Sequence, residues 1–131
     1  MLLGLVVILA GCAGAPTATA VDTPVKVVSI ESVAGKWTGR FVKSPVGPQE
    51  DWVDLTIERD GRYRFTIYRT HSVLASRGKV TLVTGELRSE SAAGKSTYRL
   101  YDREGKRILK VEALERGGYR YLAEFRPRSD R

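Results

Sequence analysis

The feature that most constrains the fold of this chain is an alternation of apolar and polar residues with a period of two. It occupies residues 52–58 and returns in residues 62–67, where aromatic residues alternate with arginines. The apolar positions of the two segments are Val53, Leu55 and Ile57, then Tyr63, Phe65 and Ile67. A period of two is that of a β-strand with one buried face. The alternation therefore predicts two neighbouring strands of an antiparallel sheet.

The connection between these segments contains Asp60 and Gly61. A two-residue loop would pair Ile57 with Arg64, an inward residue with an outward one, which strand pairing does not permit. A three-residue loop with Gly61 in the left-handed conformation pairs Ile57 with Tyr63 instead. We therefore predict a three-residue hairpin loop with a bulge at Gly61.

Short alternating segments continue along the chain, with turn residues every eight to twelve positions. In the second half, a turn at residues 103–106 would place Tyr98 opposite Val111 and Asp102 opposite Arg107. Further strands are expected at 37–42, 79–82, 86–88 and 119–126. About eight strands joined by short connections indicate an all-β fold, a small up-and-down antiparallel barrel. One short helical turn at residues 29–34, before the first strand, is expected to plug one end.

The composition limits what the barrel can be. With 131 residues and 42% hydrophobic residues, the chain is one globular domain and is not disordered throughout. It has one Cys and one His, which excludes an internal disulfide and the usual structural zinc site. There are 22 Lys and Arg against 15 Asp and Glu, a formal charge of +7.

An uncharged apolar run fills residues 2–10. It is too short to span a bilayer but has the length of the apolar region of a signal peptide. It ends in Leu9-Ala10-Gly11-Cys12, which resembles a bacterial lipobox. The resemblance implies a lipoprotein signal peptide at 1–11, lipidation of Cys12 and a membrane anchor of acyl chains. Residues 12–24 are then a flexible tether, and residues 25–131 are the barrel domain.

The lipobox resemblance also implies a location and partners. The protein would lie in a bacterial cell envelope, and Ala13 after Cys12 resembles lipoproteins of the outer membrane, if the host has one. Nucleic acid is then not an expected partner despite the charge. An envelope protein, anionic head groups or an anionic envelope polymer would fit the charge, which could also serve solubility alone. We expect a monomer.

The predicted first strand opens with Gly35 and Trp37, separated by one residue. This Gly-x-Trp start, followed by a meander, resembles lipocalin-like barrels. The resemblance implies a barrel that binds a small apolar ligand and a basic residue of the last strand over Trp37, for which Arg126 is the candidate. Small barrel lipoproteins and barrel-type envelope protease inhibitors are similarly good comparisons.

Seven aromatic residues are predicted to point into the barrel. They are Trp37, Phe41, Tyr63, Phe65, Tyr98, Tyr121 and Phe125. Each aromatic buries about 150–250 Å². They would fill a barrel of this size, or, as the alternative, leave a small apolar pocket.

No set of residues in the sequence indicates catalysis or a metal site. His71 beside Ser72 lies in a predicted loop, where adjacent side chains point apart, and no nucleophile elbow is present. Glu50, Asp51 and Asp54 lack the spacing of a calcium loop. We therefore expect that the protein is not an enzyme and binds neither a metal nor a cofactor.

Two apolar features are candidate contact sites. Val73 and Leu74 fall in a predicted loop between the third and fourth strands, either as a contact patch or folded over the open end. Trp52 and Tyr68 are predicted outward cross-strand partners, either a docking surface or a stabilising pair.

The sequence thus predicts a non-enzymatic cell-envelope lipoprotein whose barrel is an interaction module. The first alternative is a lipocalin-like binder of a small apolar ligand, with Trp37 and Arg126 near its site. The second is an envelope protease inhibitor.

Overall fold

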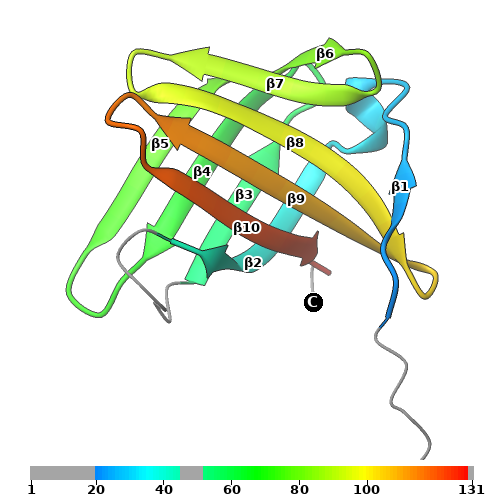
Figure 1. Cartoon of the computed structure of the whole chain (residues 1–131), viewed down its shortest axis with the longest axis horizontal. Coiled ribbons are helices and arrows are strands. Elements are labelled where there is room, and N and C mark those ends of the chain that lie inside the picture. Colours follow the sequence, from blue (N-terminus) through cyan, green and yellow to red (C-terminus); the bar gives the residue numbers. More distant parts are fainter. Residues whose placement is uncertain (1–19, 45–51, 130–131) are drawn as a thin grey trace, which may run out of the picture.

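The chain folds as an all-β, nearly closed antiparallel barrel (Figure 1). The computed structural model describes residues 20–44 and 52–129. The predicted fold class is confirmed, and the described residues form ten strands in place of about eight. The strands are β1 Thr23–Val25, β2 Gly35–Lys43, β3 Trp52–Ile57, β4 Arg62–Tyr68, β5 Val73–Lys79, β6 Thr81–Val83, β7 Glu86–Ser91, β8 Gly94–Arg103, β9 Lys106–Glu115 and β10 Arg120–Pro127.

The sheet is a meander that returns on itself. Strands β2 to β5 pair in sequence order, as do β6 to β10, and β10 then pairs with β2. The order across the sheet is therefore β5-β4-β3-β2-β10-β9-β8-β7-β6, so β5 and β6 stand at its two ends. Figure 1 shows the two halves curving around a common interior.

The predicted strand registers are confirmed. Ile57 pairs with Tyr63, and the three-residue loop between them places Gly61 at a φ of 89°. The Glu58 amide donates a hydrogen bond of 2.8 Å to the Arg62 carbonyl, which closes the loop. In the second half, Tyr98 pairs with Val111, and Asp102 pairs with Arg107. Inward and outward residues alternate on both hairpins as the period of two requires.

A short strand precedes the first one that the sequence predicts. The predicted tether extends to residue 24, but Thr23 and Pro24 already belong to β1, which pairs with β8. Before it, the Asp22 carboxylate accepts hydrogen bonds of 2.6 and 2.8 Å from the Arg103 guanidinium and lies 2.7 Å from Lys110 Nζ. This ion cluster fastens the start of β1 to β8 and β9.

The short helical turn is a 3-10 helix, η1, at Ile30–Ser32. Ser29 caps it, because its hydroxyl accepts from the Ser32 amide at 3.3 Å. The Trp37 indole donates a 2.9 Å hydrogen bond to the Val33 carbonyl directly after this helix, and both residues are fully buried. The turn thus covers the core beside Trp37, as the predicted plug would.

The core runs through the barrel beneath this turn. Its fully buried large side chains are Val27, Val33, Val53, Leu55, Ile57, Val80, Leu87, Leu109 and Phe125. Phe41, Tyr63 and Phe65 pack against it but are only partly buried. The interior is therefore not filled along its whole length.

Candidate functional site

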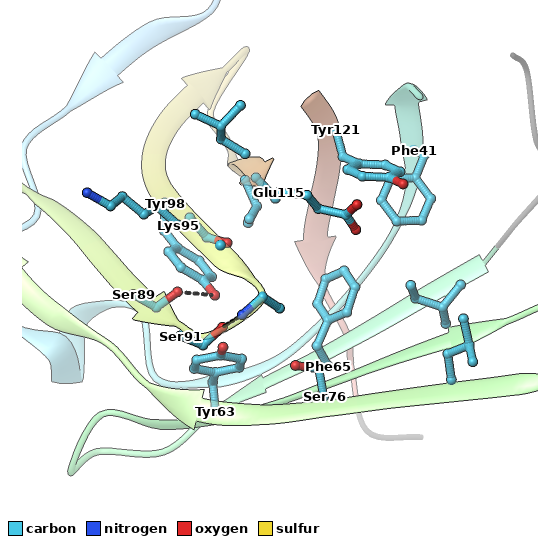
Figure 2. A pocket seen from close by; sticks show the side chains of 18 of the residues that line it. Phe41, Tyr63, Phe65, Ser76, Ser89, Ser91, Lys95, Tyr98, Glu115 and Tyr121 are labelled. Carbon is cyan, nitrogen blue, oxygen red and sulfur yellow. Dashed lines mark hydrogen bonds between the residues drawn. The ribbon is translucent and has the colours of Figure 1, made fainter. Parts of the chain in front are cut away.

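A cavity of about 330 Å³ lies inside the barrel, where the partly buried aromatic residues meet (Figure 2). Ligand pockets in proteins range from about 300 to 1,000 Å³. The aromatic residues that line it are Phe41, Tyr63, Phe65, Tyr98 and Tyr121. Five of the seven aromatics predicted to point inward thus border open space, while Trp37 and Phe125 belong to the buried core. The structure matches the predicted small pocket rather than a filled barrel.

One part of the cavity wall is purely aromatic. The ring centroid of Phe41 lies 5.8 Å from that of Tyr121 and 6.4 Å from that of Phe65. Phe65 in turn meets the buried Phe125 edge to face at 5.9 Å. These distances are those of favourable aromatic pairs, so the wall continues the core packing and is fixed in place.

Another part of the wall carries hydroxyl groups. The Tyr98 hydroxyl lies 3.4 Å from Ser89 Oγ, and both residues are buried. The Tyr63 ring is 6.1 Å from that of Tyr98, and Ser91 lies beside them in Figure 2, apart from Phe41. Burial raises the pKa of Tyr98, so its phenol stays protonated at every ordinary pH. This side offers neutral hydrogen-bonding groups to a ligand.

The charged side chains that line the cavity are exposed to solvent. They are Arg69, Lys95 and Glu115. Lys95 Nζ lies 3.7 Å from the Glu90 carboxylate, in an exposed pair that adds little stability. The interior of the cavity is therefore aromatic and hydroxylic, and its formal charges stand where water reaches them.

The structure corrects the predicted position of Val73 and Leu74. They do not lie in a loop but begin β5, because the hairpin turn is already closed by the Arg69 amide bonded to the Ser72 carbonyl at 2.9 Å. Leu74 pairs with Ile67 and lines the cavity. Val73 pairs with Tyr68 on the outer face and is 62% exposed.

His71 lies in this hairpin turn. It is exposed, as the sequence predicts.

The predicted position of Arg126 over Trp37 is wrong. Arg126 pairs with Thr38 and is exposed, since it alternates with the inward Phe125. The guanidinium over the Trp37 ring is that of Arg107 in β9, 5.6 Å from the centroid, and it also donates to the Ser32 carbonyl. Arg107 therefore tethers η1 over the end of the barrel.

The predicted pairing of Trp52 with Tyr68 is confirmed. Both side chains are exposed on the outer face, at 42% and 44%, and the Arg40 guanidinium lies 4.9 Å from the Trp52 ring centroid. Neither aromatic touches the interior cavity. The predicted contact residues thus fall on two separate surfaces, with Leu74 inside and the aromatic pair outside.

The acidic residues considered as cation ligands are not gathered into a metal site in the part of the chain that is described. Among residues 20–44 and 52–129, no three His, Cys, Asp or Glu side chains come together as metal ligands. Asp54 instead pairs with Arg128 at 3.1 Å. Cys12, Glu50 and Asp51 lie outside the described residues. No helix in the described ranges is long and apolar enough to cross a membrane.

Comparison with known proteins identifies no relative of this chain. No protein-family model, curated protein or solved structure matches the chain. The site therefore has to be interpreted from its own geometry and chemistry.

Proposed function

We propose that this protein is a lipid-anchored envelope protein whose barrel binds a small, neutral and mainly apolar molecule. The observation that carries the proposal is the aromatic cavity of about 330 Å³ inside the barrel. The lipobox ending at Cys12 supports the anchor and the envelope location. The proposal makes the domain a binding protein and not an enzyme.

The wall of the cavity indicates how such a ligand would lie. Its apolar body would pack against Phe41, Phe65 and Tyr121, where aromatic contacts contribute most of the binding free energy. A single hydroxyl, carbonyl or amide would bond to the Tyr98 and Ser89 hydroxyls. A charged ligand is disfavoured at these buried hydroxyls, because the charged residues of the lining, Arg69, Lys95 and Glu115, are exposed and are themselves in contact with water.

The test is a binding titration with a neutral apolar fluorophore, N-phenyl-1-naphthylamine, on residues 20–131, which contain all the described strands. The wild type should bind it with one-to-one stoichiometry. Ala113 lines the cavity, so Ala113→Trp should fill it and weaken binding about tenfold or more, a loss of about 1.4 kcal/mol.

The matched control is Thr97→Trp, which adds the same side chain to the outer face of the neighbouring strand β8. Thr97 pairs with Glu112 and does not line the cavity, so binding should be unchanged. Equal affinities for the Ala113→Trp variant and the wild type would place the fluorophore elsewhere and refute the proposal.

The other two functions predicted from the sequence differ in their support. The outer face of β2 to β5 favours an interaction role, in addition to ligand binding, and its partner is inferred below. The protease-inhibitor alternative stays a prediction that no observation in the described residues favours.

A further inference from the structure

The outer face of β2 to β5 carries a row of large exposed side chains that cross the strands. Arg40, Trp52, Tyr68 and Val73 are successive register partners on these four strands. Trp52 and Tyr68 are nearly half exposed, and Val73 is more so. We call these four residues the aromatic row. A contiguous exposed row of this kind is typical of a contact surface.

A second row on the same face is cationic. Lys36, Thr56, Arg64 and Arg77 are again successive register partners, and we call them the cationic row. Arg64 and Arg77 stand directly opposite each other, an arrangement of like charges that destabilises a sheet. Neither has an ion pair among the described residues, whereas the neighbouring Arg62 contacts both Glu58 and Asp60 at 2.8 and 2.7 Å. No acidic side chain of the described residues thus pairs with either arginine to offset their repulsion.

Between the two rows the surface is hollowed by a groove of about 350 Å³. Its lining includes Asp54, whose Oδ2 accepts a 3.1 Å hydrogen bond from Arg128. The other carboxylate oxygen, Asp54 Oδ1, is buried and has no hydrogen-bond partner. An unpaired buried acceptor is costly, so this wall of the groove holds a polar group that its neighbours leave unsatisfied.

We propose that this face binds an acidic polysaccharide. The apolar face of a sugar ring would pack on Trp52 and Tyr68, and ring hydroxyls would lie in the groove beside Asp54. Carboxylates of the polymer would pair with Arg64 and Arg77, which removes their mutual repulsion. This inference uses the outer surface only and does not depend on the interior cavity.

The spacing of the rows favours a chain of sugars over a single ring. Arg64 and Tyr68 are four residues apart on β4, about 13 Å at the rise of a β-strand. A ligand that reaches both rows must extend over that distance. A phospholipid surface fits less well, because a flat array of head groups does not fill the groove between the two rows.

The test measures binding of the full chain, in a non-ionic detergent, to polygalacturonate. Arg64→Ser with Arg77→Ser should weaken binding about tenfold or more, and Trp52→Ala should weaken it several-fold. The double variant should melt no lower than the wild type, because it lacks the two positive charges that face each other across β4 and β5. Loss of binding without loss of stability separates recognition from folding.

The charge-matched control is Lys106→Ser with Arg116→Ser, two exposed cations outside β2 to β5. This variant should bind as the wild type does. Equal losses in both double variants would show attraction by net charge alone and overturn the proposal. So would equal binding of polyglutamate, which has carboxylates and no rings, or binding to phosphatidylglycerol vesicles in place of polygalacturonate.

Discussion

Gly78 on β5 lies directly across from Tyr63, whose ring borders the cavity. A methyl group at residue 78 would stand 2.7 Å from the Tyr63 hydroxyl and from its ring carbon Cε1. The ring therefore lies flat over β5 only because residue 78 has no side chain. A glycine in the middle of an exposed strand thereby sets the position of a cavity wall.

Gly78→Ala is expected to displace the Tyr63 ring and weaken fluorophore binding several-fold. The cost in stability should be about 1 kcal/mol, because a side chain can move aside. Gly39→Ala is the contrasting variant: its methyl group would meet the Glu124 carbonyl oxygen at 1.9 Å, and backbone cannot yield in that way. That variant should fail to fold. Urea denaturation and the titration together check both, and unchanged affinity in Gly78→Ala would contradict the role of Gly78.

Single residues were predictable from the sequence where local pattern decides their place. The period of two assigns Tyr63 and Trp37 to the interior, and register alone requires the left-handed Gly61. Arg107 was not predictable as the partner of Trp37, since alternation gives the face of a residue but not which distant side chain reaches across the barrel. The cation over Trp37 comes from β9 because η1 and the first residues of β9 meet beside this ring.

Among the elements, the turn between β6 and β7 contains a strained position. Thr84 has a φ of 49°, which β-branched residues rarely adopt, and Gly85 follows at 81°. Two positive φ values describe a type I′ hairpin turn, for which Asn-Gly is the preferred sequence. Thr84→Asn is therefore expected to raise the free energy of unfolding by about 0.5–1 kcal/mol. Urea denaturation measures the change, and a less stable variant would show that the Thr84 side chain makes a compensating contact.

Strand β1 should detach in acid. Hydrogen bonds from Arg103 and then Lys110 lower the pKa of Asp22 far below its ordinary value of 3.8. A lowered pKa in the folded state contributes stability that is complete above the ordinary value and disappears as the pH falls below it. Asp22→Asn should therefore lower the melting temperature near pH 7 and lower it by less near about pH 2, which is well below the ordinary pKa of 3.8.

The measurement is a pair of melting curves at the two pH values, with amide exchange of the β1 region as a second readout. Glu90→Gln is the control, since its carboxylate makes only an exposed 3.7 Å contact with Lys95. If the difference in melting temperature between the wild type and Asp22→Asn is the same at both pH values, the ionised carboxylate does not have this role.

The strands that could not be predicted from the sequence are those whose apolar and polar residues do not alternate. Strand β5 is exposed at every residue, and its apolar and polar residues do not alternate. It is recognised as a strand only by its pairing with β4. Strand β1 has three residues and is held by an ion cluster whose cations lie about eighty residues away. Neither feature leaves a local signal in the residues themselves.

For the whole molecule, the proposed anchor gives a direct prediction. Cys12→Ser should move the protein from the membrane fraction to the soluble fraction, because the thiol that would carry the acyl chains is lost. Fractionation of cells that express each form measures this, with Ala13→Ser as the control. A Cys12→Ser protein that stays with the membrane would refute the anchor.

The cavity is a property of the whole barrel, and the sequence could predict its lining better than its existence. The inward aromatics follow from alternation, yet whether their rings meet depends on how far the strands are staggered around the barrel. In this fold Phe41 and Tyr121 meet each other, while Tyr63 and Tyr98 meet separately. Open space remains between these two groups, and no count of aromatic residues reveals it.

The return of β10 to β2 has a consequence for how the chain acquires its structure. Apart from β1, every other hydrogen-bonded strand pair joins neighbours in the sequence and can form locally, but this one joins Gly35–Lys43 to Arg120–Pro127. Such a distant contact has a high entropic cost and forms late. A chain emerging from the ribosome lacks the partner of β2 until β10 has been made, so the barrel cannot close while β3 to β9 are being synthesised. The export that the proposed lipid anchor implies would need an unfolded polypeptide, and the late pairing of β10 would keep the barrel open for it.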